Sequence, residues 1–331
     1  MTITMQKIYK PNEELVNLLI SRNMTIYNKS WAAKILDYEN YYYVINGYNK
    51  IFITSTIPED YYRDGTTFNE LLALYTFDRT IREKLLIELL RVEHIVKSRI
   101  VSVFSKYHGH DHTSYLRPEN FNSTSFENFK RTNSMIFDIL KLIDSQKKRH
   151  GSVKHYMDKY GYVPLWVLSK VMTFGKLNSF YSCMKNEEKT EIAAAFSLTP
   201  KEFKGIIDFI ANLRNKCAHG ERIYCHAKDV PLPRPIPSLK EHDMLGIPKN
   251  KSGHRPYGTQ DVLALLISLR YFLSPSRYNN LLNKINYALH NKLQHRLTSI
   301  DISVVENIMG LNCNWLLLTN FQQKCSAKPI V

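Results

Sequence analysis

Apolar residues recur at three- and four-residue steps through most of this chain, the spacing that places them on one face of a helix. The longest run extends from about Phe68 to Ser105, and its predicted buried stripe contains Leu85, Leu89, Val92, Val96 and Ile100. Shorter runs predict a helix after Pro11-Asn12, a second helix with Ser30 as its N-cap, and further helices near residues 126–147, 163–184, 260–272 and 277–293. Because neither an internal repeat nor a strand-rich segment is visible, the sequence predicts an all-α fold.

The best-marked helix covers residues 199–219. It opens with Thr199, Pro200 and Glu202, a capping box with proline at the first helical position. One apolar face follows, formed by Phe203, Ile206, Ile210, Leu213 and Cys217. Gly220 comes directly after the helix, where a left-handed residue is expected.

This helix ends in Arg214, Asn215 and His219, which are suited to cleaving RNA without a metal. The imidazole can exchange a proton with the 2′-hydroxyl or the leaving oxygen, and the guanidinium can hold the phosphate. Asn215 can donate to the phosphate or orient the histidine. Alternatively, the spacing is accidental and the histidine is simply favoured near a helix C-terminus.

Arg214 and His219 lie about 140° apart on a regular helix. They therefore converge only if the helix ends near the histidine, if the arginine reaches round the helix, or if a second copy faces the first.

Several other residues are candidates for supporting or binding roles. Glu93 lies at the edge of the long stripe, so it can pair with Lys97 one turn later or orient Arg214 or His219 across a helix contact. Arg222 follows the motif closely and is a further supporting candidate. Phosphate contacts are expected from basic residues that otherwise form solvated helix ends: Lys147, Lys148, Arg149, Lys176 and Lys228.

The segment from Tyr38 to Tyr48 contains five tyrosines. These rings could stack on nucleic-acid bases. We prefer the interpretation that they pack the N-terminal unit against the rest, because aromatic side chains bury large areas in cores.

The composition indicates which classes of binding partner and cofactor to expect. The 331 residues include 45 Lys+Arg and 30 Asp+Glu, a net charge of +15. Such a charge favours binding to polyanions, with nucleic acid as the first candidate and a membrane surface as the second. The alternative is that the charge only keeps the protein soluble. The five cysteines form no Cys-x-x-Cys pair, which argues against a disulfide framework and a zinc site, and no metal or cofactor is expected. With no signal-like or membrane-length apolar run, we expect a cytoplasmic protein.

Four parts are expected along the chain. Residues 1–66 form an N-terminal helical subdomain, and residues 67–225 form a helical core that carries the Arg-x4-His motif. Residues 226–258 hold six prolines and predict an extended connection outside the core. Residues 259–331 supply C-terminal helices that pack on the core.

Four stretches together resemble the Abi family of bacterial abortive-infection proteins, in particular its AbiD/AbiF group. They are Tyr43 to Tyr48, the run Phe68–Arg99, the box from Pro164-Leu165-Trp166 to Thr173-Phe174-Gly175-Lys176-Leu177, and the string from Arg214 to Arg222. The resemblance covers roughly residues 10 to 310, and the last string is its most specific part. The chain has Lys170 where the family would have an acidic residue, so no role is assigned to that position.

The resemblance implies a HEPN-type helical bundle with extra N- and C-terminal helices, and an RNA-cutting toxin active in phage defence. The matching catalytic positions are Arg214, Asn215 and His219, and Glu93 matches the acidic position on the long helix. Because HEPN sites commonly combine two motifs across a dimer, a homodimer is implied. The family also suggests control by a bound non-coding RNA or antitoxin.

Two other functions remain open. The chain could be a non-catalytic RNA-binding or scaffold HEPN protein. It could also be an interaction partner in a toxin–antitoxin system, such as the HEPN partner of a nucleotidyltransferase toxin. The intact arginine, asparagine and histidine favour the nuclease.

Overall fold

The computed structural model describes residues 9–57, 59–229 and 236–320, and within them the all-α prediction is confirmed. The helices in order are α1 (Asn12–Ser21), α2 (Lys29–Glu39), α3 (Phe68–His108), α4 (His112–Tyr115), α5 (Phe126–Gln146), α6 (Gly151–Tyr160), α7 (Leu165–Val171), α8 (Phe174–Cys183), α9 (Asn186–Ala194), α10 (Pro200–Ala218), α11 (His226–Asp229), α12 (Lys240–Met244), α13 (Val262–Leu269), α14 (Pro275–Asn286) and α15 (Ile302–Met309). The strands β1 (Ile53–Ser55) and β2 (Tyr61–Tyr62) pair as a two-stranded antiparallel sheet. Two π-helical turns, η1 (Tyr42–Asn46) and η4 (Tyr287–Leu293), interrupt the regular pattern.

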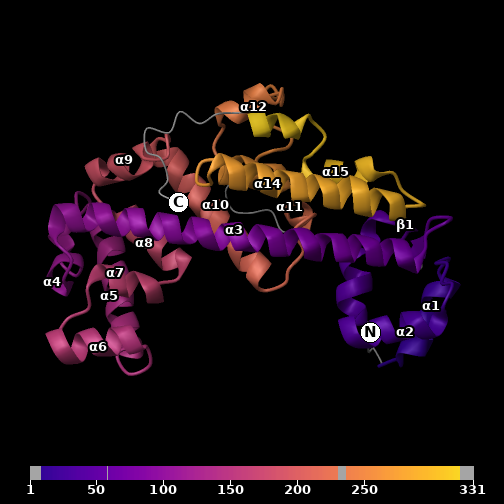
Figure 1. The fold of residues 1–331 in the computed structure, drawn as a ribbon, viewed down its shortest axis with the longest axis horizontal. Coiled ribbons are helices and arrows are strands. Elements are labelled where there is room, and N and C mark those ends of the chain that lie inside the picture. Colours follow the sequence, from indigo (N-terminus) through magenta and orange to yellow (C-terminus); the bar gives the residue numbers. More distant parts are fainter. Residues whose placement is uncertain (1–8, 58, 230–235, 321–331) are drawn as a thin grey trace, which may run out of the picture.

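Helix α3 is the spine of the molecule (Figure 1). Its 41 residues extend over about 60 Å. The predicted stripe is buried along its length, and Thr67 caps its first turn by accepting the Glu70 N–H at 3.0 Å. Helices from several later parts of the chain, namely α7 to α10, α13 and α14, pack against it. The long run of periodic apolar residues therefore predicted the element on which the other helices assemble.

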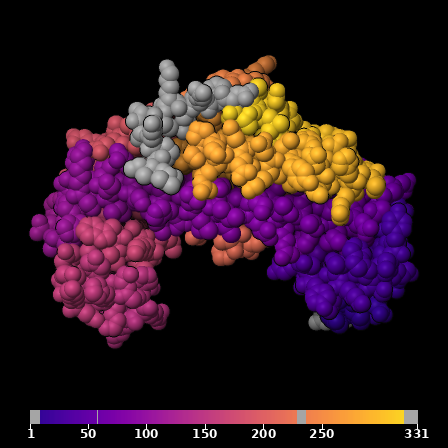
Figure 2. All heavy atoms as spheres, viewed as in Figure 1, coloured from indigo at the N-terminus to yellow at the C-terminus, as the bar shows by residue number. Residues whose placement is uncertain are grey.

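Two lobes extend from the same side of α3. The N-terminal lobe contains α1 and α2, and the other contains α5, α6 and α7, while α14 and α15 cover the opposite side (Figure 1). The space-filling view shows a broad hollow between the lobes, into which the salmon-coloured end of the α10 region protrudes (Figure 2). The end of the motif helix is thus brought to the concave face of the molecule.

Helix α10 forms as its sequence predicts. Thr199 Oγ1 accepts the Glu202 N–H at 3.3 Å, and Glu202 Oε2 accepts the Thr199 N–H at 2.8 Å, which completes the capping box. The five predicted apolar residues are all buried. His219 is the C-cap, and Gly220 has a φ of 74°, so the predicted left-handed residue is confirmed.

Two sequence-based expectations are wrong. Helix α2 is capped by Asn28, whose side chain accepts the Trp31 N–H at 2.9 Å, and not by Ser30. The 226–258 segment is not wholly outside the core, because several of its residues after 235 are buried: Ile236, Leu239, Glu241, His242, Leu245 and Ile247. Glu241 accepts hydrogen bonds from Arg270 at 2.8 Å and Tyr271 at 2.6 Å, which fixes α12 to the end of α13. Pro231, Pro233 and Pro235 lie outside the described residues.

A buried carboxylate joins the start of α3 to a segment far along the chain. Glu70 is fully buried and accepts the backbone N–H groups of Thr298 at 2.8 Å and Ser299 at 2.9 Å. The hydroxyls of both residues donate to its second oxygen. Its position in the first helical turn also favours a negative charge. Glu70 therefore satisfies donors that would otherwise lack partners where η4 and α15 are connected.

Replacing Glu70 with alanine should lower the free energy of unfolding by about 2–4 kcal/mol, because two backbone donors lose their acceptor. Chemical denaturation monitored by circular dichroism measures this loss. Glu127→Ala is the matched control, since Glu127 also lies in the first turn of a helix but is exposed. An equal effect of the two substitutions would show that only the helix-terminus charge matters at Glu70.

Candidate functional site

Arg214 lies on the last turns of α10 and reaches α3. Its Nε is 2.8 Å from Oε2 of Glu93, and Oε1 of Glu93 is 2.9 Å from Lys97 Nζ. Glu93 is buried, whereas Arg214 is partly exposed, so the carboxylate holds the guanidinium at the protein surface. Both predicted partners of Glu93, the lysine one turn later and the motif arginine, are therefore present. Lys97 also donates to the Met172 carbonyl at 2.6 Å, which ties α3 to the end of α7.

Asn215 is exposed beside Arg214 and is oriented by it. Its Oδ1 accepts a hydrogen bond from Arg214 Nη1 at 3.1 Å. The asparagine thus contacts the arginine of the motif, and the carboxamide stays at the solvent-exposed side of the helix.

His219 faces a different hollow from Arg214. The histidine is exposed at the helix C-cap, where its backbone N–H still donates to the Asn215 carbonyl at 2.9 Å. It lines a hollow of about 650 Å³ together with residues of the N-terminal lobe and the start of α3. Arg214 lines a separate groove of about 550 Å³ between α3 and α7, beside Glu93, Lys97 and Lys170. One chain therefore holds the two candidate groups on different faces, as their 140° separation indicated.

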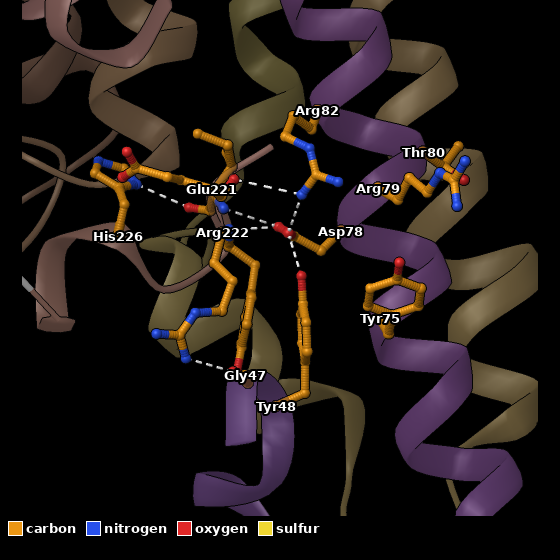
Figure 3. Close-up of polar contacts among 12 residues, drawn as sticks. Gly47, Tyr48, Tyr75, Asp78, Arg79, Thr80, Arg82, Glu221, Arg222 and His226 are labelled. Atoms are coloured by element: carbon orange, nitrogen blue, oxygen red, sulfur yellow. Dashed lines mark hydrogen bonds and ion pairs between the residues drawn. The ribbon is translucent and has the colours of Figure 1, made fainter. Parts of the chain in front are cut away.

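The backbone that follows His219 is fixed by Asp78 of α3 (Figure 3). Oδ1 of this fully buried carboxylate accepts the Ile223 N–H at 3.0 Å and the Tyr224 N–H at 2.8 Å. Its Oδ2 accepts the Tyr48 hydroxyl at 2.7 Å and Arg82 Nη1 at 3.0 Å. One carboxylate thus joins the long helix, the N-terminal lobe and the segment after the motif.

The surroundings of Asp78 contain further contacts to the same segment. Arg82 also donates to the Glu221 carbonyl at 3.3 Å, and Arg222 donates to the Gly47 carbonyl (Figure 3). Arg222, a predicted supporting residue, therefore connects the motif segment to the N-terminal lobe and lines the His219 hollow. It does not line the Arg214 groove.

Burial governs the ionisation of the neighbouring groups. It raises the pKa of the Asp78 carboxyl, although the Tyr48 hydroxyl, the backbone donors and Arg82 act in the opposite direction. It also raises the pKa of the Cys217 thiol to about 12, so this thiol stays protonated at neutral pH. Cys217 is accordingly a core residue and not a nucleophile.

The predicted phosphate-binding residues are distributed over the surface. Lys147, Lys148 and Arg149 are exposed between α5 and α6, and Lys147 lies 2.5 Å from Asp144. Lys176 is partly exposed in the first turn of α8. The side chain of Lys228 is outside the described residues. None of the described four lines the His219 hollow.

Asp78 and Arg82 belong to the candidate site, and the sequence interpretation did not single them out. A signal was available, since Asp78 lies seven residues before Leu85 and seven after Leu71, at an apolar position of the α3 stripe. Charged residues are seldom fully buried unless they are paired, so an aspartate at this position indicates a specific buried network.

The described residues include no group of three His, Cys, Asp or Glu side chains able to hold a metal ion. No helix in the described ranges is both long and apolar enough to cross a membrane.

Replacing Asp78 with alanine should destabilise the protein by about 3–5 kcal/mol, because Arg82 and the other donors lose a shared buried acceptor. Thermal or chemical unfolding measures the loss, and Asp138→Ala, an exposed aspartate on α5, should stay within about 0.5 kcal/mol of the parent. A loss no larger than that of the control would contradict the role of Asp78 as the shared acceptor.

Comparison with known proteins shows a family match for the central part of the chain. A protein-family model described as "Abi-like protein" matches residues 34–225, which is more than half of the sequence. No curated protein and no solved structure gave a match. The matched span contains α3, the tryptophan box of α7 and α8, and the motif at the end of α10. The chain therefore belongs to the Abi-like protein family.

Proposed function

We propose that this protein is a metal-independent HEPN-type endoribonuclease that acts as an abortive-infection toxin in phage defence. Membership of the Abi-like family suggests the defence role. The observation that carries the enzymatic part is the end of α10, where Arg214 is held by the buried Glu93 and His219 is exposed and lines a hollow. An arginine and a histidine in such settings can act on a phosphodiester.

The proposed reaction uses the RNA as its own nucleophile. The 2′-oxygen attacks the adjacent phosphorus as its proton passes to a general base, and the bond to the 5′-oxygen breaks as that oxygen receives a proton. The products are a 2′,3′-cyclic phosphate and a 5′-hydroxyl. His219 is assigned the proton transfers, and Arg214 stabilises the charge on the phosphate oxygens. Asn215 donates to the phosphate or keeps the arginine in place.

The active unit is proposed to be a homodimer. Arg214 and His219 of one chain line different hollows, so a single phosphate meets both groups only if two copies contribute. A suitable surface lies beside Arg214, where Ile87, Leu90 and Trp166 are exposed apolar side chains. Leu90 and Trp166 line the Arg214 groove itself. Such patches mark association surfaces, and a second copy would bring its own motif to this groove.

The basic surface is proposed to bind RNA beyond the cleavage site. The net charge of +15 and the exposed Lys147, Lys148 and Arg149 between α5 and α6 support contacts with phosphates. A bound non-coding RNA or antitoxin would use the same surface to restrain the toxin.

When the wild-type protein is expressed in a bacterium, growth should slow and cellular RNA should be cleaved. His219→Ala or Arg214→Ala should relieve both effects. Loss of one such group costs about two to four orders of magnitude in rate. Growth curves and sequencing of RNA ends measure the effects, and cleavage should persist in EDTA. The matched controls are His295→Ala and Arg117→Ala, both at exposed positions away from the motif. If the folded motif variants remain as toxic as the wild type, the catalytic assignment is wrong and the non-catalytic RNA-binding alternative is favoured.

Leu90→Asp should convert the dimer to a monomer and abolish cleavage while leaving the fold intact, because it places a charge in the proposed interface. Light scattering gives the mass and circular dichroism the helix content. Leu140→Asp is the matched control, since Leu140 is 45% exposed on α5 and Leu90 is 46% exposed on α3. A wild-type protein that is monomeric while cleaving RNA would rule out the composite site.

A further inference from the structure

The hollow that contains His219 has an aromatic wall supplied by the N-terminal lobe. Tyr42 and Tyr43 both line it, and they are 67% and 64% exposed. Their rings lie 6.2 Å apart at an angle of 74°. They belong to the π-helical turn η1, a type of element that is rare and frequent at functional sites. Among the neighbouring tyrosines, Tyr48 is buried and Tyr41 is partly buried, while Tyr38 is exposed but does not line the hollow.

Behind this wall the hollow is rigid. The ring of Tyr48 stacks on Tyr224 at a centroid distance of 5.6 Å and meets Tyr75 edge-on at 5.5 Å. The Tyr48 hydroxyl is fixed by Asp78, and the Tyr75 hydroxyl donates to Glu39 at 2.6 Å. The exposed rings are therefore mounted on a packed support beside His219.

The polar lining of the hollow favours an anion. Four cationic side chains border it, namely Arg79, Arg82, Lys216 and Arg222, against the two carboxylates of Glu39 and Glu221. Arg79 pairs with Glu39 at 3.1 Å and Arg82 with the buried Asp78 at 3.0 Å. With Asp78 counted, four cationic groups face three carboxylates, so the lining keeps a small net positive charge. A volume of about 650 Å³ lies within the usual range of small-ligand pockets.

We propose that this hollow binds an unpaired nucleotide next to the scissile phosphate, with its base on Tyr42 or Tyr43 and its phosphate near Arg79 and Lys216. This inference rests on the proposed function, which places the reacting phosphate at His219. A base within a duplex is stacked and paired, so its face cannot reach these rings, whereas a base in a loop or a single strand can. The substrate is therefore single-stranded RNA, and the N-terminal lobe selects it.

The charges and the position of the rings favour a nucleotide over a protein partner. Stacking on a tyrosine needs only a π-face and tolerates any base, while the neighbouring cations recognise the phosphate that every nucleotide carries. If Tyr42 and Tyr43 instead bind a protein partner, the test below should find the same RNA affinity with and without the two rings.

The test measures RNA affinity in a His219→Ala background, where cleavage does not consume the probe. Fluorescence anisotropy is recorded with a labelled single-stranded 12-nucleotide oligouridine and with a 12-base-pair RNA duplex. The double substitution Tyr42→Ala/Tyr43→Ala should weaken single-strand binding by about 5- to 150-fold, as expected for the loss of base stacking. Tyr42→Phe should leave the single-strand affinity unchanged, because the ring is kept. Duplex affinity should be the same in all variants.

Tyr38→Ala is the matched control, since Tyr38 is 86% exposed on α2 and does not line the hollow. An unchanged single-strand affinity in the double tyrosine variant, an equal loss in the Tyr38 variant, or the absence of single-strand binding would each overturn the nucleotide pocket. The nuclease assignment fails separately, if His219→Ala leaves RNA cleavage and toxicity unchanged. A ring-dependent affinity combined with that result would retain the pocket and reject the catalytic role.

Discussion

The buried carboxylate of Asp78 is the interaction on which the arrangement of this molecule depends. Its two oxygens accept from the N-terminal lobe, from α3 itself and from the backbone after the motif. A buried charge is costly unless all its hydrogen-bonding capacity is used, and here four donors use it. The three segments are therefore held in one geometry, because moving any of them would leave a buried charge or donor without its partner.

This constraint explains why the end of α10 is suited to a reacting group. Position 219 combines an exposed side chain with a fixed backbone: the histidine closes a capped helix, and Asp78 holds the chain four and five residues later. Arg214 is held in a similar way by Glu93 from the same long helix. Two buried carboxylates of α3, about four turns apart, thus position the two faces of the motif.

Local patterns predicted most of the fold and part of the site. The extent of α3 and α10, the capping box, Gly220 and the pairing of Glu93 follow from interactions within a few residues or between one stripe and its neighbour. Asp78 was missed because all its partners except Arg82 lie 30 or about 145 residues away in the chain. The docking of residues 236–247 was missed for the same reason: prolines describe local backbone, whereas Glu241 is held by Arg270 and Tyr271. Of the five tyrosines of the N-terminal segment, Tyr48 is packed in the core as expected, whereas Tyr42 and Tyr43 are exposed and do not take part in that packing.

The pairing of Arg214 with Glu93 has a consequence for the proposed chemistry. A guanidinium beside a carboxylate contributes little net charge, so additional cations are needed to attract a phosphate. Lys97 and Lys170 line the same groove and supply them. Lys170 is the position where the family resemblance led us to expect an acidic residue, and the reversed charge is favourable beside a polyanion. Because Nε of Arg214 faces Glu93, its terminal nitrogens form the edge that remains for a phosphate, with Nη1 already oriented by Asn215. The carboxylate therefore sets the direction of the arginine, while the lysines set the sign of the field in which it acts.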